Sequence, residues 1–114
     1  MISLKRVYEP TSSTDGQRIL VERLWPRGVS KEKAKITIWM TDIAPSTALR
    51  KWYSHDIAKW SEFKKRYIEE LKENRDTVKY LQQLIKKGST TFVFAAKDTE
   101  HNSAVVLKEF LEGA

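Results

Sequence analysis

The segment TTFVFAA, residues 90–96, restricts the fold more than any other stretch of the chain. Its β-branched and aromatic residues favour an extended strand. The apolar residues that follow the two threonines do not alternate with polar ones, and a strand of this kind is buried on both faces of a sheet. Helical patterns lie before and after it, so the sequence predicts an α/β fold in which at least some strands are parallel.

Three further strands are predicted before the helical middle of the chain. Two of them, residues 2–8 and 17–25, have the apolar content of strands, and residues 36–40 form a shorter candidate. Pro26 is expected to end the second strand, because proline has no amide hydrogen for the sheet ladder.

Helical periodicity fills the middle and the end of the chain. Ser46 and Asp56 are the expected N-caps of the first two helices. The predicted helices cover residues 46–53, 56–73 and 76–87, and a last one follows Asp98. An apolar stripe with helical spacing marks the second helix; its members are Ile57, Trp60, Phe63, Tyr67 and Leu71. We therefore predict one small α/β domain over residues 1–114, with a partly parallel sheet flanked by helices.

The composition excludes several classes of chemistry. The chain has no cysteine, which rules out disulfides, thiolate nucleophiles and cysteine-based metal sites. Lys5 and Arg6 interrupt the N-terminal apolar stretch, so we predict no signal peptide. No apolar run approaches the roughly 20 residues that span a bilayer. We expect a cytoplasmic protein with no membrane contact and no cofactor.

The basic charge is unevenly distributed. The formal net charge is +6, and residues 1–66 hold 14 lysines and arginines against 7 acidic residues. Residues 67–114 hold 7 against 8, so the excess belongs to the first part. Such a surface favours an anionic partner, and it also serves solubility alone. Both interpretations stay open at this point.

Charged residues follow two predicted strands at their carboxyl ends, in ERLWPRG (residues 22–28) and AKDTEH (residues 96–101). In open α/β sheets, ligands bind beyond these ends, where loops and helix N-termini meet. We therefore predict a ligand site here, at which Arg27 and Lys97 approach one another. The candidate ligand-binding residues are Arg23, Trp25, Arg27, His55, Lys97 and Asn102, and the candidate acid–base residues are Asp98 and His101.

The acid–base candidates also have a structural interpretation. Capping of the last helix would by itself explain Asp98. His101 would then lie near the third helical position, where the helix dipole favours the neutral imidazole that can act as a base. His55 and Asp56 resemble a metal-binding pair, but no other histidine lies nearby and Asp56 is already an expected cap, so we predict no metal site.

The arginines and Trp25 have structural alternatives too. Arg23 or Arg27 would need a partner if buried, and either Glu22 or Asp42 could supply one. Arg27 follows a proline in a loop without a packing pattern, which favours a binding role. Trp25 belongs either to the core or to an apolar wall beside Arg27.

Three segments carry a resemblance to a known family. They resemble the YeaO-like branch of the domain of unknown function 488 family, and they read DGQRILVERLWPRGVSKEK, DIAPSTALRKWYSHD and FAAKDTEHNSAVVLKEFL. The resemblance covers nearly the whole chain and implies a small cytoplasmic α/β domain without an established activity. The family commonly has proline where this chain has Thr99. Wider relatives carry cysteines near this loop where this chain has alanine and asparagine, so thiol chemistry cannot be carried over.

These observations lead to one expected function and two alternatives. We expect a cleft that binds a small ligand with a phosphate or carboxylate group. Any reaction there would be acid–base chemistry of a metal-independent hydrolase or lyase, because glycine-rich phosphate loops, nucleophile elbows and paired-histidine zinc motifs are absent from the sequence. The first alternative is a nucleic-acid-binding module whose binding is weak and salt-sensitive. The second is a protein-interaction adaptor.

Overall fold

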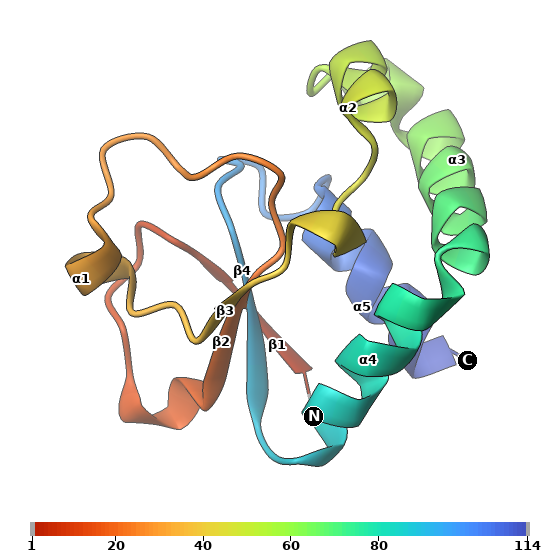
Figure 1. Cartoon of the computed structure of the whole chain (residues 1–114). Helices are drawn as coiled ribbons and strands as arrows, with labels where there is room; N and C mark the ends of the chain where they lie inside the picture. The colour runs from red at the N-terminus through yellow and green to blue at the C-terminus, as the bar shows by residue number, and fades with distance from the viewer. Residues whose placement is uncertain (1, 114) are drawn as a thin grey trace.

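A parallel four-stranded sheet forms the centre of the protein, whose computed structural model describes residues 2–113 (Figure 1). The strands are β1 (Ile2–Arg6), β2 (Gln17–Leu20), β3 (Ile38–Trp39) and β4 (Thr90–Phe94). Their order is β1-β4-β2-β3, and every pairing is parallel. All residues of β4 are buried, as predicted for a central strand covered on both faces. The α/β fold class is therefore confirmed.

Most of the helices cover one face of the sheet. The α-helices are α1 (Lys31–Ala34), α2 (Thr47–Tyr53), α3 (Trp60–Glu73), α4 (Arg75–Lys86) and α5 (Ser103–Gly113). Three short 3-10 turns also occur: η1 (Ser13–Asp15), η2 (Thr41–Ile43) and η3 (Ile57–Lys59). In Figure 1, α3, α4 and α5 lie to one side of the strands and α1 lies to the other. No helix within residues 2–113 is long and apolar enough to cross a membrane.

The helix caps arise from local sequence. Ser46 Oγ accepts a hydrogen bond from the amide of Leu49, and Asp56 Oδ1 accepts one from the amide of Ala58. The Ser46 prediction is therefore confirmed, whereas Asp56 caps the turn η3, and α3 begins only at Trp60 without a side-chain cap. Ile57 lies in η3 and is 58% exposed, so its assignment to the buried stripe is wrong.

The sheet separates two clusters of apolar side chains. Ile19, Phe92 and Phe94 point into the larger cluster, which the helices complete. The alternating residues Leu20 and Val93 point into a smaller cluster on the other face, covered by the connection between β2 and β3. This alternation explains why the central strands contain almost no exposed residue.

β2 is shorter than predicted and ends at Leu20 instead of near Pro26. The Val21 amide still donates to the carbonyl of Val93 in β4. At the next residue, the side-chain carboxylate of Glu22 accepts the Ala95 amide at 3.0 Å. This tertiary contact, and not the proline, accompanies the departure of the chain from the sheet.

The start of α5 also differs from the prediction. α5 begins at Ser103, so Asp98 is not its N-cap and His101 lies outside the helix. Asn102 takes the capping position instead, because its Oδ1 accepts the amide of Val105 at 3.1 Å.

Candidate functional site

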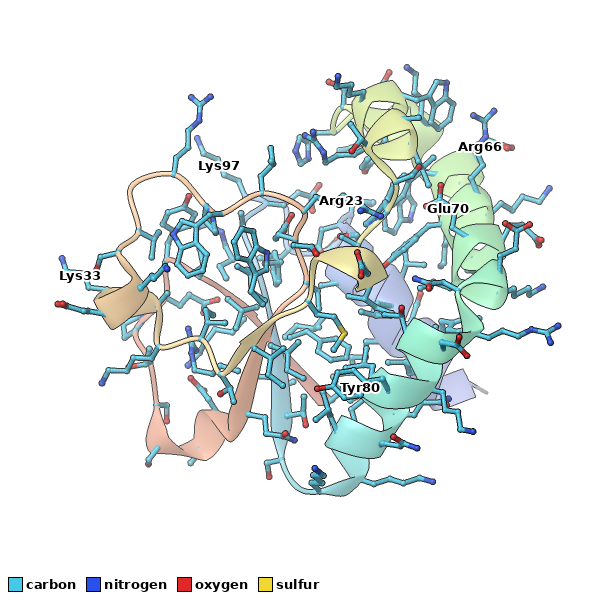
Figure 2. All side chains as sticks on the ribbon, viewed as in Figure 1. Arg23, Lys33, Arg66, Glu70, Tyr80 and Lys97 are labelled. Carbon is cyan, nitrogen blue, oxygen red and sulfur yellow. The ribbon has the colours of Figure 1, made fainter. Side chains whose placement is uncertain are left out.

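A cleft of about 740 Å³ opens at the carboxyl edge of the sheet. Its walls come from the segments after β2 and β4, from α2 with its flanking residues, from Phe63 of α3, and from the start of α5. The lining comprises residues 22–23, 44–45, 50–51, 53–55, 63, 95–98 and 102–103. Figure 2 shows Arg23 and Lys97 toward the same upper end of the molecule, whereas Lys33 projects from the side that carries α1. The cleft thus has the expected position for a ligand site in a parallel sheet.

Exposed cations gather at the rim of this cleft. Arg50 and Lys51 come from α2, and Lys97 follows β4. None of the three side chains forms an ion pair or a hydrogen bond with another group in residues 2–113. Three exposed cations therefore line the cleft without a partner in the described part of the chain.

Arg23 is a structural part of the cleft wall. Its Nε donates to the carbonyl of Pro45 at 2.8 Å, and its Nη2 donates to that of Ala44 at 3.3 Å. These bonds attach the segment before α2 to the end of β2. Arg23 thus bonds backbone carbonyls instead of the expected carboxylates of Glu22 or Asp42.

Glu22 is a half-buried carboxylate in the same wall. Its Oε2 accepts the Ala95 amide, and its backbone carbonyl accepts the indole N–H of Trp39 at 2.7 Å. Burial raises the pKa of the Glu22 carboxyl, and the Ala95 hydrogen bond and the nearby charges of His55 and Arg50 only partly offset this effect. The cleft therefore holds one carboxylate whose charge is poorly solvated.

Asp98 organises the turn between β4 and α5. Its Oδ1 accepts the amides of Glu100 and His101, and its Oδ2 lies 2.9 Å from Nδ1 of the His101 ring. The hydrogen bond from the Glu100 amide lowers the pKa of Asp98, and those from the His101 amide and ring add to it, against a smaller effect of burial. The His101 ring packs edge-on against Trp60, with ring centroids 5.2 Å apart. Both residues therefore have clear structural roles.

The end of α2 brings an unusual backbone to the edge of the cleft. Ser54 and His55 have φ values of 45° and 57°, so two consecutive residues other than glycine adopt the left-handed conformation. Such conformations cost free energy and cluster at functional sites. Here they place the His55 side chain in the lining of the cleft.

The structure brings five of the eight sequence-predicted site residues into the cleft lining: Arg23, His55, Lys97, Asp98 and Asn102. The other three, Trp25, Arg27 and His101, are not among the lining residues. The expected convergence of Arg27 with Lys97 is therefore not found in this cleft. The binding and acid–base roles of all eight stay predictions.

Local contacts explain why two of the candidates lie elsewhere. Trp25 packs against the smaller apolar cluster on the other face of the sheet, and its indole N–H donates to the carbonyl of Val29 at 2.7 Å. The structure therefore agrees with a packing role for Trp25 and not with an apolar wall beside Arg27 in the cleft. The side chain of Arg27 is exposed, and its carbonyl accepts a hydrogen bond from the Tyr8 hydroxyl.

Sequence reasoning missed four prominent lining residues: Glu22 as a ligand group, Arg50, Lys51 and Tyr53. The two cations of α2 have the same local pattern as any solvated helix surface. Only the packing of α2 over the carboxyl edge brings them to the cleft. The sequence offered one indication of where these cations lie: the preceding Pro45-Ser46 pair, which fixes the residue at which α2 begins.

A second, smaller depression lies between β3 and α4 and has a volume of about 330 Å³. Trp39 and Tyr80 line it, and its charged side chains are the carboxylates Asp42 and Asp76. It therefore lacks the cations expected of an anion site. Among residues 2–113, no three histidine or acidic side chains gather in a way that could hold a metal ion.

Comparison with known proteins identifies the family. A family model described as the inactive DUF488-N3 subclade matches residues 1–114. The uncharacterized protein YeaO of Escherichia coli K12 is 40% identical over 110 residues, which is 96% of each chain. The uncharacterized protein Rv3073c of Mycobacterium tuberculosis is 38% identical over 112 residues, which cover 98% of this chain and 94% of the relative. No solved structure matches. The chain therefore belongs to the inactive DUF488-N3 subclade.

Proposed function

We propose that the cleft at the carboxyl edge of the sheet binds a small organic anion with a phosphate or carboxylate group. The main support is that Arg50, Lys51 and Lys97 all line this cleft, are exposed, and have no ion-pair partner within residues 2–113. Like charges that share a site repel one another, and an anion bound between them removes this repulsion.

The dimensions and apolar content of the cleft favour an organic molecule over a free inorganic ion. The volume of about 740 Å³ falls within the range of roughly 300–1,000 Å³ that is usual for small-molecule sites. Tyr53 and Phe63 are buried side chains of its wall, and their rings stack with centroids 4.3 Å apart. The rim would thus bind the charged group, and these rings would contact the carbon skeleton.

Recognition without turnover fits the site better than catalysis. The matching family model describes its subclade as inactive. Both oxygens of Asp98 already accept hydrogen bonds in a turn, and the ring of His101 lies against Trp60 instead of lining the cleft. We therefore propose a binding protein in which these two residues shape the site.

Thermal unfolding with a panel of organic phosphates and carboxylates at constant ionic strength tests this proposal. A ligand at 100 times its Kd stabilises the native state by about 2.7 kcal/mol. Arg50→Ala and Lys97→Ala should each weaken the affinity by about tenfold to a hundredfold, because a charge-assisted hydrogen bond contributes roughly 1.5–3 kcal/mol.

Lys33→Ala and Arg75→Ala are the matched controls. Each removes one exposed positive charge outside the cleft, so the affinity should change less than twofold to threefold. Equal losses in all four variants would show diffuse attraction to a basic surface and would overturn the proposed site. A panel without any stabilising anion would also contradict it.

A further inference from the structure

Several polar side chains in the wall of the cleft already have partners in the protein. Arg23 donates to two backbone carbonyls, and both oxygens of Asp98 take part in hydrogen bonds. Asn102 donates through Nδ2 and accepts through Oδ1. Glu22 differs, because its Oε2 accepts the Ala95 amide whereas its Oε1 has no donor within residues 2–113. One acceptor of the cleft wall is therefore available to a ligand.

This free oxygen is accessible. Side-chain nitrogen and oxygen atoms that are fully buried and have no hydrogen-bond partner can be identified within residues 2–113, and Nη2 of Arg18 is the single case. Oε1 of Glu22 also lacks a protein partner but does not share that full burial, and Glu22 lines the cleft. Oε1 therefore keeps some accessible surface, on a residue that lines the cleft.

Glu22 is also held in place before any ligand arrives, with one contact to its backbone and one to its carboxylate. Trp39 donates to its backbone carbonyl, and Ala95 donates to Oε2 of its carboxylate. These two contacts attach it to β3 on one side and to the end of β4 on the other. A fixed acceptor loses little conformational entropy on binding, which makes it an effective recognition group.

We propose that Glu22 binds an amino group of the ligand, so that the cleft selects anions that also carry an ammonium group, such as amino acids or aminoalkyl phosphates. This inference rests on the proposed anion site. The anionic group binds to Arg50, Lys51 and Lys97 at the rim, and the ammonium group donates to Oε1 of Glu22 in the wall.

The electrostatics of the cleft support this assignment. A partly buried carboxylate loses hydration, and a cationic donor compensates for that loss better than a neutral one. A plain anion, in contrast, is repelled by Glu22. Because burial raises the pKa of Glu22, an ammonium that favours the ionised form should offset the cost of keeping this carboxylate charged beside His55 and Arg50.

Matched pairs of small probes test the inference. We would titrate the full chain with phosphoethanolamine and ethyl phosphate, and with β-alanine and propionate, by calorimetry at constant ionic strength. The wild type should bind each amino-bearing probe at least tenfold more tightly than its partner. Glu22→Gln should abolish this preference and leave the plain anion equally or more tightly bound, because it removes a repelling charge.

The outcomes separate this inference from the proposed function. Equal affinity of the wild type within each pair would overturn the role of Glu22 and leave the anion site intact, provided that Lys97→Ala still weakens both probes. A preference that persists in Glu22→Gln would overturn it as well. Failure of every probe to bind would overturn both proposals. The wild-type comparison requires no variant, so it holds even if Glu22→Gln folds poorly.

Discussion

Replacing Asp15 with asparagine should destabilise the fold strongly, because Asp15 neutralises a buried arginine at the end of the sheet opposite the cleft. Its Oδ2 lies 2.7 Å from Nη1 of Arg18 and accepts the amide of Ser12, and its Oδ1 lies 3.0 Å from Nζ of Lys5. The side chains of Asp15 and Arg18 are 7% and 5% exposed. The guanidinium of Arg18 also donates from Nε to the carbonyl of Ala34.

The expected cost follows from this burial. Removing one partner of a buried ion pair leaves an uncompensated charge and costs about 3–5 kcal/mol. For a chain of this size, each kcal/mol corresponds to roughly 3–6 °C in Tm, so Asp15→Asn should unfold about 9–30 °C below the wild type. Glu62→Gln is the matched control, because it breaks a 2.9 Å pair with Arg66 in which both side chains are 50% exposed. That pair should contribute at most about 1 kcal/mol.

The pH dependence provides a second readout. Burial opposes ionisation of Asp15, but hydrogen bonds from Lys5, the Ser12 amide and Arg18 outweigh it and lower the pKa. The contribution of Asp15 is therefore present above its unfolded pKa of about 3.9 and is lost as the pH falls through the lowered folded value. Urea unfolding of both proteins should show a large difference at pH 7 that shrinks in acid. A loss no larger than that of Glu62→Gln at pH 7 would refute the assignment of a buried, stabilising pair.

Four further substitutions should change stability, and one more prediction concerns nucleic acid. Gly16→Ala should cost about 3–5 kcal/mol, because its φ is +63° and a Cβ would collide with the Ser89 carbonyl. Gly28→Ala, with φ +74° and open space, should cost only about 1–2 kcal/mol in the same urea titrations. Asn102→Ala should cost roughly 0.5–2 kcal/mol through loss of the α5 cap, and a thermal melt without any change would contradict that cap. Glu22→Gln should be more stable than the wild type at pH 7 but not at pH 4, because a raised carboxyl pKa means that stability falls as the pH rises. Binding to DNA or RNA should be weak and should fall steeply with salt, and tight sequence-selective binding near physiological salt would contradict the preference for a small ligand.

Local sequence was sufficient for much of the fold. The lack of alternation in β4 identified a central strand, and the short side chain of Ser46 identified the start of α2, because each feature depends on neighbouring residues only. The end of β2 could not be predicted in the same way. It coincides with a bond between Glu22 and Ala95, two residues that are far apart in the sequence.

The cleft illustrates the same limit of local reasoning. Lys97 follows a strand directly, so its place at the carboxyl edge could be predicted from the strand alone. Arg50 reaches that edge through the packing of α2, which no local pattern encodes. Trp25 and Arg27 also follow a strand, but the chain leaves the sheet early and carries Trp25 to the opposite face. A strand boundary misplaced by a few residues was enough to misplace these two.

The anion site is tested most directly by following the backbone amides of isotope-labelled protein by NMR during titration with phosphoethanolamine. Saturable shifts should appear in residues 22–23, 50–55 and 95–98, which surround the cleft. Arg50→Ala should raise the Kd obtained from these shifts about tenfold or more. Shifts that do not saturate, or that centre on exposed basic residues outside the cleft such as Lys33 and Arg75, would contradict a specific anion site at the carboxyl edge of the sheet.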